Sequence, residues 1–304
     1  MKGTTMFAAG FAFLIQLIAI FAADQKALVV AKVNGAGISA ADVDFAAIQK
    51  GVTADERAEA EPKLLEQLID RQLIRTFLLS KKIEPNAEEL QFQIAKAEVA
   101  IRKHGEDPGK LFAKIGYTPE RLKSELGLPL AWQTYARQTV TAQQLKEYFE
   151  AHKQELDGTQ LRANQVCLKL PAKADASSIA AKKAKLAEVR QDIVANKLSF
   201  TDAVKQFSEA PGKDQGGDVG LFSWQVGLVK ELAHKAFSLK VNEISEPIVS
   251  PFGVHLIQVT ERHPGEFSLE DVRPVIQDRL SQQLWDETVK KLRSTAKIEM
   301  DLKK

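Results

Sequence analysis

The 304-residue sequence predicts an α+β fold, with a mostly helical N-terminal region followed by a region that mixes helices and strands. Apolar side chains recur at helical spacing from Leu64 to Leu78, which predicts one broad buried helix face. Between Val254 and Val259 the side chains alternate between two faces, as in a sheet strand. With 44% hydrophobic and 27% charged residues, the polypeptide is able to build one or two packed cores.

Charge and cysteine content exclude several classes of function. The 42 basic and 40 acidic residues are well mixed, so nothing indicates a nucleic-acid partner. Cys167 is the sole cysteine, and we predict a buried, inert thiol in a strand. The histidines lack metal-ligand spacing such as His-Glu-x-x-His, so we expect neither a metal site nor a cofactor. They are His104, His152, His234, His255 and His263.

The N-terminus has the pattern of a targeting segment. Lys2 precedes an apolar run from Met6 to Ala23, which ends in small residues before Asp24. We interpret residues 1–23 as a secretory signal peptide. The alternative is a retained membrane anchor, because the run approaches the ~20 residues that span a bilayer. Both interpretations export the remaining polypeptide, to the periplasm or an equivalent compartment, and the mass of the mature N-terminus distinguishes them.

A strand and a series of helices follow. The sequence predicts a strand over Leu28–Val33 that enters a tight turn at Asn34-Gly35. Pro62 is expected at the start of the Leu-rich helix. Asn86, with Glu89 three residues later, predicts a helix start. Further helices are expected from Thr118-Pro119, with an interruption around Gly127–Pro129 because proline cannot donate, and from Thr141.

Beyond a boundary near Asp157-Gly158, short strands and helices alternate. Gly216-Gly217 predicts a sharp turn, since adjacent glycines permit positive φ and close approach of neighbouring backbone. The expected strands are 161–170, 219–222, 248–249 and 254–259, and the expected helices are 177–197, 200–207 and 229–239. Ser268 with Asp271 opens a long amphipathic helix. We predict that the alternating tail, Lys297–Leu302, pairs with Leu28–Val33 and so completes the helical region.

Four phrases of the second region occur in one order and resemble the catalytic core of parvulin-type peptidyl-prolyl cis/trans isomerases. They are Gln206-Phe207-Ser208-Glu209, Gly216-Gly217-Asp218-Val219-Gly220-Leu221-Phe222, Ala236-Phe237-Ser238-Leu239 and Phe252-Gly253-Val254-His255-Leu256-Ile257. The helical region resembles, more loosely, the chaperone domain of SurA-like and PpiC-like exported foldases; an ordinary helical bundle is the alternative. The resemblance implies a chaperone domain over 24–157, a parvulin-like domain with a small antiparallel sheet surrounded by helices over 158–264, and a C-terminal helix and strand over 265–304 that pack back on the chaperone domain.

The resemblance also assigns site residues. It implies a proline pocket and, beside it, a polar part made by Ser250 and His255. The pocket residues are Val219, Leu228, Leu232 and Phe252. A histidine that sits on a strand can instead serve only to order the sheet, so both roles of His255 stay open.

Three positions depart from the family pattern. Gln165 replaces the histidine of the first strand and can hydrogen-bond but not titrate. Ala210 stands where the family has Cys or Asp, and Leu232 where it has a pocket phenylalanine. We keep Gln165 among the catalytic candidates and Ala210 among the substrate-binding ones. The departures predict weak isomerase activity.

Two functions follow from the resemblance. The first is an exported folding factor that binds unfolded or nascent exported polypeptides, including outer-membrane proteins, and isomerises X-Pro bonds. Such catalysis need only favour a twisted amide, without cofactor or covalent intermediate. The second is a chaperone whose parvulin domain is weak or inactive and only binds peptide. The sequence leaves the oligomeric state open.

Overall fold

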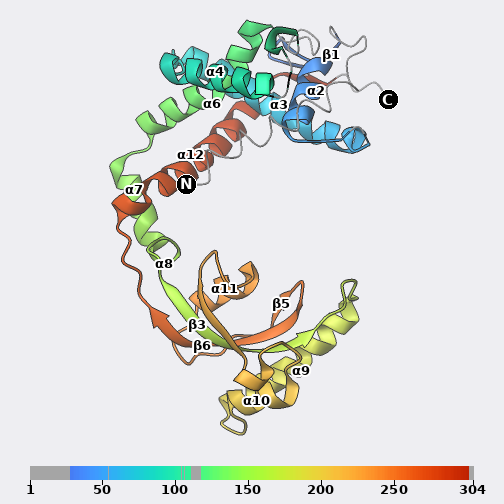
Figure 1. Cartoon of the computed structure of the whole chain (residues 1–304), viewed down its shortest axis with the longest axis vertical. Coiled ribbons are helices and arrows are strands. Elements are labelled where there is room, and N and C mark those ends of the chain that lie inside the picture. Colours follow the sequence, from blue (N-terminus) through green and yellow to red (C-terminus); the bar gives the residue numbers. More distant parts are fainter. Residues whose placement is uncertain (1–27, 54, 104, 106, 111–117, 301–304) are drawn as a thin grey trace. The chain divides into compact units, whose positions relative to one another are not determined.

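The computed structural model describes residues 28–300, except 54, 104, 106 and 111–117. The backbone forms two compact units, one made of the residues up to Thr141 and from Gln277 onward, the other of Ala142–Ile276 (Figure 1). The sequence places the domain boundaries at 157 and 264, and this division stays a prediction. The segment after 264 belongs with the second unit because Phe267 N donates to Asp157 O at 2.9 Å. The predicted signal peptide, residues 1–23, lies outside the described residues.

The first unit contains a three-stranded antiparallel sheet, in the order β2-β1-β7. Strand β1 (Val29–Val33) turns into β2 (Ala36–Ser39) through Asn34 and Gly35, whose φ angles are 50° and 85°. These positive values explain the Asn-Gly pair. The last strand, β7 (Ile298–Met300), pairs with β1, placing Ile298 opposite Val33. The predicted pairing of these two distant segments is confirmed.

Helices pack against this sheet and against one another. Helix α3 (Arg57–Ser80) buries the predicted Leu and Ile stripe against β1 and α2 (Ala40–Gln49). Helix α4 (Ala87–Lys103) begins after Asn86, whose Oδ1 accepts from Glu89 N at 2.9 Å, as expected. The later part of α12 (Leu269–Arg293) also belongs to this unit. No helix among the described residues is long and apolar enough to cross a membrane.

Two local predictions for this unit were wrong. Helix α3 begins at Arg57, so Pro62 lies inside it and not at its start. Helix α6 (Pro119–Thr139) begins after the N-cap Thr118 and runs unbroken through Pro129. Proline at that position leaves the carbonyl of Glu125 without its helical donor. Arg71 Nη2 donates to this carbonyl at 3.4 Å, which offsets the missing bond.

The second unit begins with α7 (Ala142–Ala151) and the single turn α8 (Lys153–Leu156). It is built on a four-stranded antiparallel sheet, in the order β4-β3-β6-β5. Its strands are β3 (Gln160–Lys169), β4 (Asp218–Ser223), β5 (Ile248–Ser250) and β6 (Gly253–His263). Together the two units confirm the predicted α+β fold.

Helices cover both faces of this sheet (Figure 1). Helices α9 (Ala176–Val194) and α10 (Phe200–Phe207) pack with Val254 and Leu256 of β6. Helix α11 (Lys230–Phe237) packs on the opposite face, with Ile257 and Val259. The alternation along β6 therefore separates two apolar cores, and His255 points to the α11 side with Ile257.

Candidate functional site

The imidazole of His255 lies at the centre of three hydrogen-bonded side chains. His255 Nδ1 is 3.1 Å from Gln165 Oε1 on β3, and Nε2 is 2.8 Å from Ser250 Oγ at the end of β5. Because the amide oxygen can only accept, Nδ1 carries the proton and Nε2 accepts from the hydroxyl. Ser250 Oγ in turn accepts from Phe252 N at 3.1 Å.

Burial keeps this group of side chains uncharged. His255 is 4% exposed, and this desolvation lowers its pKa from 6.5 to about 4, so the imidazole is neutral near pH 7. Cys167 Sγ lies 3.9 Å from His255 Nε2, and burial raises the pKa of its thiol to about 11. The thiol therefore stays protonated, in agreement with the prediction of an inert cysteine. The site offers neutral hydrogen-bonding groups and no charged nucleophile.

Three of the predicted pocket residues lie together. Val219, Leu228 and Leu232 belong to the apolar cluster on the α11 face of the sheet, which also contains Ile257 of β6. Val219 and Leu228 are partly exposed, whereas Leu232 is only 2% exposed. Leu232 therefore supports the site from the core and offers little surface to a ligand.

The other two predicted contact residues lie outside that cluster. Phe252 is 63% exposed in the turn between β5 and β6, close to Ser250 in sequence. Ala210 N lies 3.4 Å from Ser208 Oγ, which also accepts from Cys167 N at 3.3 Å. The buried Ser208 appeared in the sequence only as part of a phrase; its contact with the strand that carries Cys167 depends on tertiary structure. All binding and catalytic roles at the site stay predictions.

The double glycine sets the position of Gln165. Gly216 and Gly217 have φ angles of 72° and 80°, as the predicted sharp turn requires. Gly217 O accepts from Gln165 N at 2.8 Å, and a Cβ on Gly217 would lie 2.4 Å from Gln165 O. Only glycine allows this approach to β3. The sequence indicated the turn but not its contact with a site residue.

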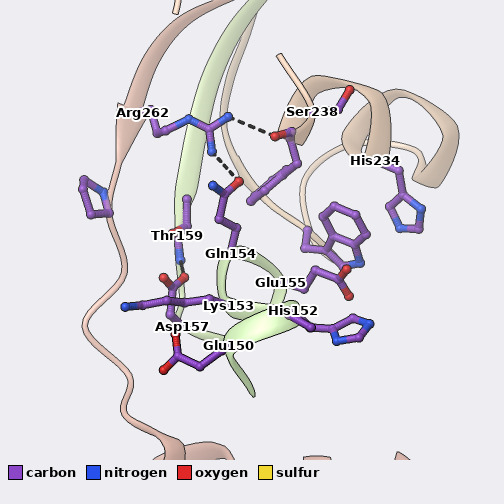
Figure 2. Close-up of a pocket in the computed structure, with 14 residues that line it drawn as sticks. Glu150, His152, Lys153, Gln154, Glu155, Asp157, Thr159, His234, Ser238 and Arg262 are labelled. Carbon is purple, nitrogen blue, oxygen red and sulfur yellow. Dashed lines mark hydrogen bonds between the residues drawn. The ribbon is translucent and has the colours of Figure 1, made fainter. Parts of the chain in front are cut away.

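A hollow of about 630 Å³ lies elsewhere in the second unit (Figure 2). Trp224 stacks on His234 there with ring centroids 4.0 Å apart, and Arg262 Nη1 donates to Gln154 Oε1 at 2.8 Å. None of the predicted site residues lines this hollow. Its walls come from four separate stretches of sequence with no shared motif, so the sequence carried no signal for it. Among the described residues, no group of three or more His, Cys, Asp and Glu side chains could hold a metal ion.

The depressed pKa of His255 predicts a pH dependence of stability. Between about pH 6.5 and pH 4, His255 binds a proton in the unfolded protein but stays neutral in the folded protein. The free energy of unfolding must therefore fall as pH falls through this window. His255→Gln removes this contribution, which is at most about 1.4 kcal/mol per pH unit. Denaturant titrations of both proteins between these pH values measure the difference. Identical pH slopes for the two proteins would contradict the assigned pKa shift.

The sequence comparisons define the class of the second unit. Residues 166–261 match the family model described as the rotamase, or PPIC-type PPIase, domain. This segment includes Ser250 and His255, and Gln165 directly precedes it. It also includes β4, β5, the last four residues of β3, and β6 without its last two residues. The second unit therefore contains a parvulin-type domain.

Particular relatives are foldases and chaperones. The sequence is 31% identical to foldase protein PrsA 1 of Bacillus cereus over 147 residues, 48% of this protein and 44% of that one. It is 36% identical to chaperone SurA of Cupriavidus metallidurans over 121 residues, 38% of this protein and 24% of that one. The protein is thus similar to PrsA and SurA, and the match spans less than half the length of these two relatives.

A third relative and one solved structure extend the comparison. A probable parvulin-type peptidyl-prolyl cis-trans isomerase of Bordetella bronchiseptica is 34% identical over 110 residues, 35% of this protein and 42% of that one. The crystal structure of PrsA from Bacillus cereus matches with a TM-score of 0.51 and 21% identity, covering 91% of this protein and 95% of that one. At this identity the structural match supports the fold alone.

Proposed function

We propose that the protein catalyses cis/trans isomerisation of X-Pro peptide bonds at the site around His255. The observation that carries the proposal is the hydrogen-bonded set of Ser250, His255 and Gln165, buried and neutral, on the same sheet face as the apolar cluster of Val219 and Leu228. The match to the PPIC-type domain supports the same activity. An apolar surface beside neutral hydrogen-bonding groups suits a proline ring and its preceding amide.

The chemistry requires only differential binding. Rotation about the X-Pro bond meets a barrier of ~18–20 kcal/mol because resonance is lost in the twisted amide. Apolar side chains that hold the proline ring, and hydrogen-bonding groups that favour the twisted amide, lower this barrier without a covalent step. A neutral imidazole can hold the Ser250 hydroxyl in place at pH 7, so the site needs no change of charge during turnover.

We infer that the client is an unfolded polypeptide and that the protein acts after export. The relatives named foldase and chaperone support the first part, and the targeting pattern of residues 1–23 supports the second. The first unit would hold clients, as its resemblance to a chaperone domain implies. Outer-membrane proteins are among the clients that the resemblance suggests.

A binding protein without isomerase activity is the second candidate function. Two observations favour it: Leu232, at the expected position of the pocket phenylalanine, is buried in the core, and Gln165 cannot titrate. In this case the second unit only docks peptide, and client aggregation would be suppressed without any change in prolyl isomerisation rate.

The cis-to-trans rate of X-Pro peptides tests the proposal. We expect His255→Ala to reduce the catalysed rate by about tenfold or more, because it removes the group that holds both Ser250 and Gln165. His263→Ala is the matched control, since the side chain of His263 is exposed and its contact is with Glu261, at 2.9 Å. A folded wild-type protein with no rate enhancement would exclude the enzyme and leave the binding protein.

A further inference from the structure

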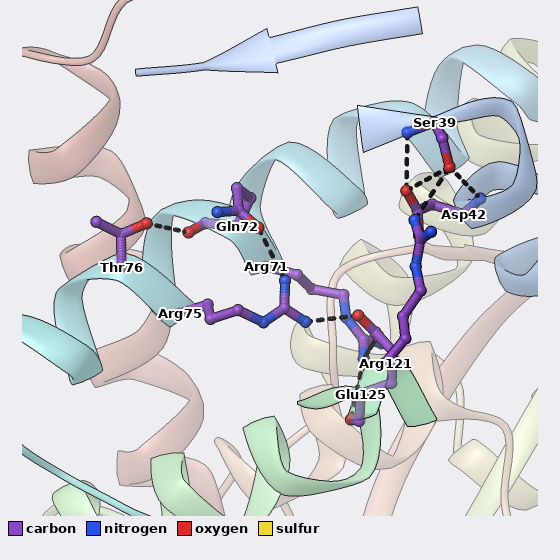
Figure 3. Close-up of polar contacts among 8 residues, drawn as sticks. All are labelled: Ser39, Asp42, Arg71, Gln72, Arg75, Thr76, Arg121 and Glu125. Atoms are coloured by element: carbon purple, nitrogen blue, oxygen red, sulfur yellow. Dashed lines mark hydrogen bonds and ion pairs between the residues drawn. The ribbon is translucent and has the colours of Figure 1, made fainter. Parts of the chain in front are cut away.

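The first unit contains a hollow of about 340 Å³ whose walls carry three guanidinium groups. Figure 3 shows the polar contacts of these arginines. Arg71 and Arg75 come from successive turns of α3, and Arg121 comes from the start of α6. Gln72 and Ser124 also line it. None of these residues entered the sequence-based predictions, because arginines separated by fifty residues show no motif.

The two carboxylates of this hollow are already bound. Glu125 is 10% exposed, and its Oε2 and Oε1 each accept at 2.5 Å, from Arg71 Nη2 and Arg75 Nη2. Asp42 Oδ1 accepts from Arg121, while its Oδ2 accepts from the backbone and the hydroxyl of Ser39. Among the described residues that line the hollow, three arginines therefore face two carboxylates whose oxygens are all engaged.

Several donor atoms of Arg71 and Arg75 have no acceptor among the described residues. Within the described residues, the Nε atoms of Arg71 and Arg75 are buried without a hydrogen-bond partner. Arg71 uses only its Nη2 in the contacts that the structure shows. Buried donors of a charged group are costly to leave unpaired. These two Nε atoms have almost no accessible surface, so a ligand would instead meet Nη atoms such as Arg71 Nη1, which makes no hydrogen bond among the described residues.

Arg71 also acts on a nearby lysine. The pKa of Lys50 is lowered, first by its partial burial and then by the charges of Lys63 and Arg71. Lys50 Nζ donates to Gln67 Oε1, so the lysine itself is held at this side of α3.

We propose that this hollow binds a carboxylate of a client polypeptide, either the client's terminal carboxylate or an Asp or Glu side chain. Arginine pairs bind carboxylates in a planar, bidentate manner, and Arg71 and Arg75 already hold the Glu125 carboxylate between them. A hollow of about 340 Å³ is at the lower end of ligand pockets, so it admits a carboxylate with a few neighbouring atoms. The proposal rests on the proposed binding of unfolded polypeptides, which it deepens.

Matched peptides test this site. One labelled, unstructured peptide is prepared with a free C-terminus and with a C-terminal carboxamide, and a third form carries the amide and one internal glutamate. Fluorescence anisotropy with the full-length protein should show about tenfold weaker binding of the neutral amide than of the free acid, the loss of one charge-assisted contact. If the glutamate form binds as tightly as the free acid, the site accepts carboxylates in general. If the glutamate form binds as weakly as the neutral amide, the site is specific for the C-terminal carboxylate.

Substitution locates the contact. Arg71→Gln should abolish the preference for the free acid, and Arg102→Gln, which changes an exposed arginine paired with Glu98 on α4, should keep it. If Arg71→Gln does not fold, the alternative experiment is to add acetate to the wild-type protein bound to the free-acid peptide. Failure of acetate to displace the peptide would overturn the site. Equal binding of acid and amide overturns the carboxylate site but leaves polypeptide binding intact. No binding of any peptide overturns both, whereas the isomerase assay reports independently on the site around His255.

Discussion

Replacing Gly217 with alanine should lower the free energy of unfolding by about 3 kcal/mol or more. Two effects add at this residue. Its φ of 80° is unfavourable for any side chain, and the new Cβ would lie 2.4 Å from Gln165 O and 3.0 Å from Val204 Cγ2. The first neighbour is backbone of β3, so the strand itself must move. Since Gln165 holds His255, we also expect isomerase activity to fall.

Gly216→Ala is the matched control for this prediction. Gly216 has a φ of 72°, but nothing lies within 4 Å of the position that an alanine Cβ would take, so only the backbone strain remains, about 1 kcal/mol. Chemical denaturation of the two variants measures the difference. Equal losses would mean that the close approach of Gly217 to β3 contributes nothing to stability.

Removing the carboxylate of Glu125 should cost about 3 kcal/mol, at the low end for a broken buried ion pair because Arg71 and Arg75 keep 29% and 22% of their side-chain exposure. Glu125→Ala leaves two guanidinium groups close together, partly buried and without their shared anion. These arginines join α3 to α6, so the loss should appear in thermal unfolding of the first unit. Glu125→Gln, which keeps the shape and one acceptor, should lose less.

An exposed pair provides the comparison. Glu98 and Arg102 lie four residues apart on α4, and their side chains are 37% and 60% exposed. Glu98→Ala should change stability by only about 0.5 kcal/mol, because solvent already screens this pair. A Glu125→Ala variant as stable as Glu98→Ala would show that the buried cluster is not a determinant of the first unit.

Periodicity was sufficient to predict most of the secondary structure. The Leu-rich stripe of α3 and the alternation along β6 each repeat over several turns or pairs, so burial on a defined face follows from sequence alone. The break predicted at Pro129 was wrong because the effect of this proline depends on a distant side chain: Arg71 supplies the donor that proline withdraws. Local rules cannot include a partner that only the tertiary fold brings near.

Only those residues of the candidate site that lie within short sequence motifs could be predicted. His255 and Ser250 are five residues apart on one hairpin, whereas Gln165 meets them through the pairing of β3 with β6 and was found only by resemblance. Resemblance could not show that Leu232 is core or that Phe252 is exposed, since both follow from packing. The arginine hollow had no sequence signal at all, because its three cations meet only when α3 and α6 pack together.

The pairing of β1 with β7 has a consequence for the order in which the protein acquires structure. Residues 29–33 are synthesised long before residues 298–300, so their sheet stays incomplete until the later residues have been made. The second unit, by contrast, is one uninterrupted stretch, Ala142–Ile276, and it can reach its native state while the first still lacks an edge strand. Until residues 292–300 have been made, a growing polypeptide therefore lacks the β7 edge of this sheet and the contacts of Leu292, Ala296 and Ile298 with the apolar cluster that contains the α3 stripe.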